Sequence, residues 1–186
     1  MAKLRRARAY RSMERPYTRV SKFKKKSYIR MTPTRKVTRF NMGEIKQYGY
    51  TLDLVPKASI QIRQESIESA RQTSLKWLEK NLAKGEFHFK IRKYPYHILR
   101  ENPLASGAGA DRVSTGMARP FGKPIGVALQ INEGDRFFTI DVNEDGINAA
   151  RKALKRAAKK MPCSFTIQQK KLSSPIIATT TTNNQR

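Results

Sequence analysis

Apolar and polar residues alternate along residues 46–62, in the first part of the central chain. Every second residue from Tyr48 to Leu54 is tyrosine or leucine, with polar or small residues between them. A period of two is typical of a strand with one buried face. Pro56 interrupts this strand, and the extended pattern resumes at residues 59–62. We therefore predict two consecutive extended segments.

A helical period follows at about residues 64–83. Apolar residues recur there at spacings of three, four and five and fall on one helical face: Ile67, Ala70, Leu75, Leu78 and Leu82. Lys84 and Gly85 supply the basic last turn and the glycine that commonly end a helix. At 1.5 Å per residue this helix is about 30 Å long, enough to cross a small sheet.

The second half of the chain has shorter periods. Residues 87–92 alternate between apolar side chains and His88, Lys90 and Arg92, which predicts a strand with one basic, outward face. The same reasoning gives a short strand at 96–99, a hairpin formed by 125–131 and 136–142, a helix from Asn143 to about Lys160 with its basic residues facing away from its apolar stripe, and a last strand at 164–168.

These elements predict an α+β fold, in which two helices pack on one face of a mainly antiparallel sheet. Regular helices do not separate the strands, so a doubly wound parallel sheet is disfavoured. We expect three parts: an arm at 1–40, a globular domain at 41–172 and a low-complexity tail at 173–186.

Charge changes this picture most at the N-terminus. The chain has 39 Lys and Arg against 14 Asp and Glu, a net charge of +25, which calls for a polyanionic partner. The arm has aromatic residues at irregular intervals and a single acid, Glu14. We expect it to be disordered in isolation and to follow the phosphates of RNA or DNA, its aromatic residues either stacking on bases or anchoring the arm to its own domain. A solvated tail or a targeting segment is the simpler alternative.

The candidate phosphate-binding residues of the arm are its basic side chains, to which the strand end at 92–93 adds two more. They are Arg5, Arg6, Arg8, Arg11, Arg15, Arg19, Lys22, Lys24, Lys25, Lys26, Arg30, Arg35, Lys36, Arg39, Arg92 and Lys93.

Residues 101–122 form a long glycine-rich loop without any apolar period. Loops of this length are usually functional or disordered, and glycine permits a close backbone approach to a partner. Arg112, Arg119 and Lys123 supply positive charge. Spacing alone leaves two alternatives open, a flexible finger that reaches a nucleic acid and a disordered surface loop.

Catalytic and cofactor chemistry has no support in the residue pattern. Gly122-Lys123 lacks the Ser or Thr that completes a P-loop, and Gly107-Ala108-Gly109 lacks the third glycine of a dinucleotide fingerprint. Cys163 is the only cysteine and there are two histidines, a poor set for zinc and one that suits a reducing cytosol. No apolar run approaches 18 residues. We expect no enzyme activity, no cofactor, no metal and no membrane partner.

Several motifs together resemble the universal sixteenth large-subunit ribosomal protein family, called L-sixteen in bacteria and L-ten-e in archaea and eukaryotes. The order and spacing of these motifs match the family over about residues 3–170, and the core sequence resembles that of archaeal members. The matching stretches are Arg5 to Arg11, Arg15-Pro16-Tyr17, Pro95 to Arg100, Ala108 to Arg112, Thr115-Gly116-Met117 and Phe121 to Pro124.

The resemblance implies a hammerhead-like α+β sandwich that binds 23S-type rRNA in the large ribosomal subunit, near 5S rRNA, A-site tRNA and other ribosomal proteins. It implies a cytoplasmic protein that is not a homo-oligomer. The loop would point toward the peptidyl transferase centre, with Arg100, Gly109, Asp111, Arg112, Gly116, Arg119 and Lys123 in it or at its base. A non-ribosomal RNA chaperone or nucleoid protein is the alternative, because it would share the basic arm without needing the loop.

Overall fold

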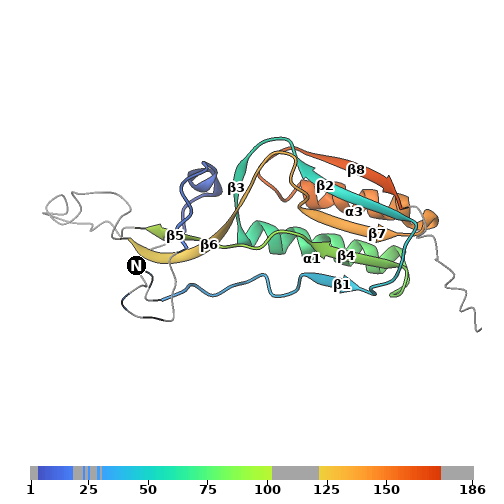
Figure 1. Cartoon of the computed structure of the whole chain (residues 1–186), viewed down its shortest axis with the longest axis horizontal. Helices are drawn as coiled ribbons and strands as arrows, with labels where there is room; N and C mark the ends of the chain where they lie inside the picture. The colour runs from blue at the N-terminus through green and yellow to red at the C-terminus, as the bar shows by residue number, and fades with distance from the viewer. Residues whose placement is uncertain are drawn as a thin grey trace, which may run out of the picture.

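The computed structural model describes residues 4–18, 23, 25, 29, 31–101 and 122–172. Two antiparallel sheets and two α-helices give the expected α+β class (Figure 1). The five-stranded sheet contains β1 (Asn41–Gly43), β4 (Phe87–Ile91), β7 (Phe138–Val142), β2 (Tyr50–Pro56) and β8 (Phe165–Lys171), in that order across the sheet. The three-stranded sheet contains β3 (Ile60–Arg63), β6 (Lys123–Ile131) and β5 (His97–Glu101).

The five-stranded sheet buries one face against the helices. In its register, Leu52 of β2 lies opposite Ile140 of β7, which in turn lies opposite Phe89 of β4. All three side chains are fully buried. Alternate residues of a strand point to the same side of a sheet, so this row of apolar side chains and its neighbours form the core. The predicted alternation places the apolar residues of 50–54 and 87–91 on one face, but the prediction of a single buried face is wrong, because Thr51, Asp53 and His88 are buried on the other.

Two helices cover that apolar face. Helix α1 (Gln64–Asn81) and helix α3 (Ile147–Ala158) pack side by side, and α3 also contacts β2, β7 and β8 (Figure 1). The α3 side of the helix pair is lined by small residues, and Ser74 of α1 donates a hydrogen bond of 3.2 Å to the carbonyl oxygen of Ala153. Small side chains let the two helix axes approach closely.

The predicted hairpin of residues 125–131 and 136–142 is wrong. β6 pairs with β3 and β5, whereas β7 pairs with β2 and β4 in the other sheet. The backbone N–H of Phe137 bonds to the Leu54 carbonyl, and that of Gly134 bonds to the Pro56 carbonyl. The connection therefore crosses between sheets beside the β2–β3 connection. A short polar turn predicts a hairpin only when no other strand takes up the hydrogen bonds.

Two smaller differences from the prediction concern an additional strand and the start of the second helix. Strand β1 was not predicted, and its Gly43 has a φ of 81°. A Cβ at Gly43 would lie 2.1 Å from the Phe87 carbonyl oxygen, so only glycine fits there. The second helix begins with a 3₁₀ turn, Glu144–Gly146, and Asn143 makes no capping hydrogen bond through its side chain.

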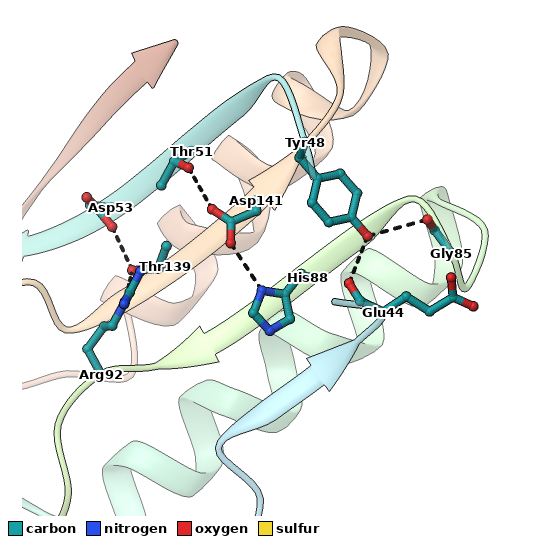
Figure 2. A network of polar contacts seen from close by, with 9 residues as sticks. All are labelled: Glu44, Tyr48, Thr51, Asp53, Gly85, His88, Arg92, Thr139 and Asp141. Atoms are coloured by element: carbon teal, nitrogen blue, oxygen red, sulfur yellow. Dashed lines mark hydrogen bonds and ion pairs between the residues drawn. The ribbon is translucent and has the colours of Figure 1, made fainter. Parts of the chain in front are cut away.

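The outward face of the five-stranded sheet carries a polar network (Figure 2). Asp141 accepts a 2.6 Å hydrogen bond from the Thr51 hydroxyl and lies 3.1 Å from Nδ1 of His88. One row away, the Thr139 hydroxyl donates to Asp53 at 2.6 Å. His88 points to the outward face as expected, but the expectation that it is a surface residue is wrong, because only 7% of it is exposed and it pairs with Asp141.

Candidate nucleic-acid interface

The three-stranded sheet carries both ends of the glycine-rich loop that was predicted to face RNA. β5 and β6 lead into and out of the segment 102–121, which lies outside the described residues. At its root Glu101 pairs with Lys123, after a register shift at Leu99/Arg100. A Cβ at Gly122 would lie 2.8–3.0 Å from the backbone of Glu101. Glycine therefore lets the two ends of the loop come together there.

The N-terminal arm lies against the same sheet and is held by its backbone. The Gln61 amide donates to the Tyr10 carbonyl at 2.9 Å, while the Gln61 backbone N–H bonds to the Arg11 carbonyl at 3.1 Å. The Gln130 amide donates to the Glu14 carbonyl at 2.7 Å and to Gln61 Oε1 at 2.9 Å. Both glutamines are buried. For residues 4–18, the expectation of disorder in isolation is therefore wrong.

Arm side chains add further contacts to this sheet. The Arg100 guanidinium carbon lies 3.7 Å from the centre of the Tyr17 ring, and that of Arg63 lies 5.9 Å from the Tyr10 ring. Arg5 forms an ion pair of 2.7 Å with Glu101. Of the two roles considered for the arm's aromatic residues, anchoring to the domain thus holds for Tyr10 and Tyr17.

His97 completes the anchor and requires a neutral ring. The backbone N–H of Tyr17 donates to His97 Nδ1 at 2.8 Å, and the Ile98 N–H bonds to the Tyr17 carbonyl at 3.0 Å. Burial lowers the pKa of His97 below its usual value; Glu14 opposes this shift and Arg100 adds to it. The lone pair that accepts the Tyr17 N–H would be lost on protonation at Nδ1.

Acidification should loosen the arm. Because the folded pKa of His97 lies below the unfolded one, the unfolded chain takes up a proton first as pH falls through about 6.5. Stability that is fully present above that pH is therefore lost below it. We expect faster amide exchange at Tyr17 and Ile98 at pH 5.5 than at pH 7.5, after correction for intrinsic rates. His97→Gln should remove the difference, and an unchanged pH dependence in that variant would refute the assignment.

The predicted site residues that the structure describes fall into two groups, with Lys25 in neither of them. Around the three-stranded sheet, Arg5 and Arg100 are engaged within the protein, while Arg6, Arg8, Arg11, Arg15 and Lys123 are exposed. Near the start of α1 and the end of β4, Arg35 and Arg39 are exposed, whereas Lys36 contacts Glu65 at 3.1 Å, Arg92 contacts Thr139 at 3.0 Å and Lys93 contacts Asp135 at 3.1 Å. Lys25 is exposed and belongs to neither group. The remaining predicted site residues lie outside the described residues: Arg19, Lys22, Lys24, Lys26, Arg30, Gly109, Asp111, Arg112, Gly116 and Arg119.

The ion pairs of Lys36 and Lys93 do not remove these lysines from the candidate interface. Both lysine side chains are at least 39% exposed. Exposed pairs contribute only about 0–1 kcal/mol, so a phosphate can replace the carboxylate at little cost.

Two exposed tyrosines were not identified from the sequence. Tyr94 is 59% exposed and packs edge-on against Phe40 of the arm, with ring centres 4.7 Å apart. Tyr96 is 40% exposed, just before β5. Partly exposed aromatic rings beside basic residues can stack on unpaired bases. The signal was present as the run Tyr94-Pro95-Tyr96, since proline keeps adjacent side chains out of a regular strand.

Within the described ranges, no group of three or more His, Cys, Asp or Glu is placed to hold a metal ion. None of the helices seen in the described part of the chain is long and apolar enough to cross a membrane.

Comparison with known proteins supports the family resemblance that motifs such as the one at residues 95–100 indicated. Residues 15–168 match the family described as ribosomal protein L16p/L10e. The chain is 47% identical to "Large ribosomal subunit protein uL16" of Nanoarchaeum equitans over 75% of this chain and 78% of the relative. It is also 40% identical to the protein of that name from Archaeoglobus fulgidus, over 84% of this chain and 87% of the relative. The identity to the protein of that name from Methanococcus maripaludis is again 40%, over 88% of this chain and 92% of the relative. This chain therefore belongs to the ribosomal protein L16p/L10e family.

Proposed function

We propose that this chain is a structural constituent of the large ribosomal subunit that binds large-subunit rRNA. The observation that carries the proposal is the family match over residues 15–168. The names of the archaeal relatives support the same assignment. The protein acts by binding, without catalysis or a cofactor, and its partners are rRNA and neighbouring ribosomal proteins.

The arm and the root of the loop form one binding unit in this proposal. The arm is tied to β3, β5 and β6 through Gln61, His97 and Gln130, and the loop leaves from β5 and returns to β6. Exposed arginines of the arm neutralise rRNA phosphates, and Tyr94 and Tyr96 offer rings to unpaired bases. Specificity then comes from the shape of folded rRNA.

The finer placement follows from the family resemblance. The domain would be the hammerhead-like sandwich of the family with an extended rRNA-binding arm. The loop at 101–122 would point toward the peptidyl transferase centre and A-site tRNA, close to 5S rRNA. Because Arg5 and Glu101 link the arm to the loop root, rRNA bound by the arm would also fix the direction in which the loop leaves the domain.

Cosedimentation tests the ribosomal assignment. Tagged chain expressed in an archaeal host should migrate with large subunits and whole ribosomes on sucrose gradients at moderate salt. Chain found only in free or DNA-bound fractions would contradict the proposal and favour the non-ribosomal nucleic-acid binder.

Replacing residues 105–118 with a Gly-Ser linker tests the role of the loop. The shortened chain should still enter the large subunit, because the arm and sheet are intact. Subunits that carry it should bind A-site tRNA more weakly and translate more slowly. Unchanged translation would contradict the proposed location near tRNA without affecting the ribosomal assignment.

A further inference from the structure

The exposed side of α3 is almost entirely basic. Five residues of α3 are exposed, Asn148, Arg151, Lys152, Lys155 and Arg156, and all but Asn148 are basic. Lys159 and Lys160 continue the series in the turn after the helix. We call these six cations the α3 basic face. From Gly146 to Arg186 the sequence contains no Asp or Glu.

The six cations lack carboxylate partners in the described part of the chain. Arg151 donates to the Gln169 side chain at 2.7 Å, and the Arg156 guanidinium carbon lies 3.7 Å from the centre of the Trp77 ring, but no ion pair involves the face. Helix α1 provides an internal comparison, since it mixes three acids with three basic residues. A helix that is only solvated usually has such a mixture.

The arrangement also opposes the stability of the free helix. Arg151, Lys155 and Lys159 are four residues apart, as are Lys152, Arg156 and Lys160. Like charges at this spacing are neighbours on a helix and repel one another. Interaction with the C-terminal end of the helix dipole compensates only in the last turn. A bound polyanion would relieve this repulsion along the whole face.

The chemistry of the face fits phosphates better than bases. The large exposed apolar side chains of the described chain are Leu4, Met13, Phe23, Met31, Ile45, Tyr94, Tyr96 and Leu172, none of them on α3. Four of the six cations are lysines, and the two arginines are already engaged with Gln169 and Trp77. A helix with these side chains and no exposed aromatic ring is suited to neutralising a duplex backbone and poorly suited to stacking on splayed bases.

We propose that the α3 basic face binds the phosphate backbone of an RNA duplex, as a second RNA surface separate from the arm. This rests on the proposed ribosomal function. Residues 4–18 of the arm lie on the three-stranded sheet, whereas α3 packs against β2, β7 and β8 of the other sheet (Figure 1). The protein would thus bridge two rRNA segments, and the two sheets and the core between them set the distance between those segments.

Neutralising the face tests the proposal on the full chain. The face variant is Lys152→Gln, Lys155→Gln, Lys159→Gln and Lys160→Gln together. The matched control replaces Lys57, Lys76, Lys84 and Lys90, which lie outside α3 and the arm and have no ion pair in the described part of the chain, with glutamine. Both variants lose four positive charges, so they differ only in where the charge is removed.

The first readout is binding to a 20-base-pair RNA duplex across a potassium chloride series. The face variant should flatten the plot of log Kd against log salt by about four, roughly one per lysine. Its loss of affinity between 50 and 200 mM salt should then be roughly 10²-fold smaller than that of the parent chain. The control should keep most of the parent slope. Equal slopes for the two variants would overturn the proposal.

The second readout is the salt at which the chain leaves large subunits on sucrose gradients. The face variant should leave at lower salt than the control. If the parent chain itself does not cosediment, the ribosomal assignment fails; if parent and both variants cosediment equally, only the α3 proposal fails. The melting temperature of the free face variant should stay equal or rise, because repulsion is removed. A clear fall would contradict the view of α3 as a mutually repelling face.

Discussion

Replacing Arg6, Arg8, Arg11 and Arg15 with glutamine should weaken rRNA binding by roughly 10²-fold near physiological salt. All four side chains are exposed, so their guanidinium groups are available to phosphates. The backbone bonds that hold the arm, such as the 3.1 Å bond from the Gln61 N–H to the Arg11 carbonyl, do not depend on these side chains. The arm should therefore stay docked while its charge is lost.

The measurement is the affinity for large-subunit rRNA over a salt series, with the slope of log Kd against log salt falling by about four. The four-lysine control described above has the same change in net charge and should keep a slope near that of the parent. If both variants weaken binding equally, net charge and not the arm determines affinity, and the role given to the arm is wrong. Amide exchange at Tyr17 reports whether the arm has remained in place.

Ile140→Ala should lower the free energy of unfolding by about 2–5 kcal/mol. Ile140 is fully buried on β7, opposite both Leu52 of β2 and Phe89 of β4. Removing its side chain leaves a cavity at the centre of the five-stranded sheet, beneath the helices. The free energy of unfolding of a domain is usually only about 5–15 kcal/mol, so this one change should remove a large share of the stability of this domain.

Ile45→Ala is the matched control, because Ile45 is 79% exposed and follows β1. Its effect should stay within about 0.5 kcal/mol. Urea denaturation followed by circular dichroism measures both variants. Similar losses at the two sites would show that Ile140 does not occupy the centre of a single core.

The elements with a clear hydrophobic period were predicted from the sequence. The helix expected at 64–83 ends two residues earlier, and the strand expected at 87–92 ends one residue earlier. What could not be predicted was the pairing of strands. β6 and β7 follow each other after a short turn but belong to different sheets. Local sequence determines that a segment is extended, whereas its partner depends on which other strand offers free hydrogen-bonding groups.

The candidate interface was predicted only in part, for a similar reason. Clustered charge identified the arm, because charge density is a property of the sequence itself. Gln61, His97 and Gln130 were not identified, because a buried polar side chain is recognised by what it contacts. His88 was placed on the surface although it pairs with Asp141, which is 53 residues away. The α3 basic face was visible as a charge pattern, but its lack of carboxylate neighbours required the fold.

The sequence by itself determined the α+β class, the two helices, the basic arm and membership in a family recognisable from short motifs. These depend on residue type and on spacing within a few turns or strands. Only the tertiary structure decided that there are two sheets, that the arm docks through its backbone on the smaller one, and that α3 presents its cations well away from it. Each of these three features depends on contacts between residues that are far apart in the chain. Such contacts cannot be predicted from the local hydrophobic periodicity of a single sequence.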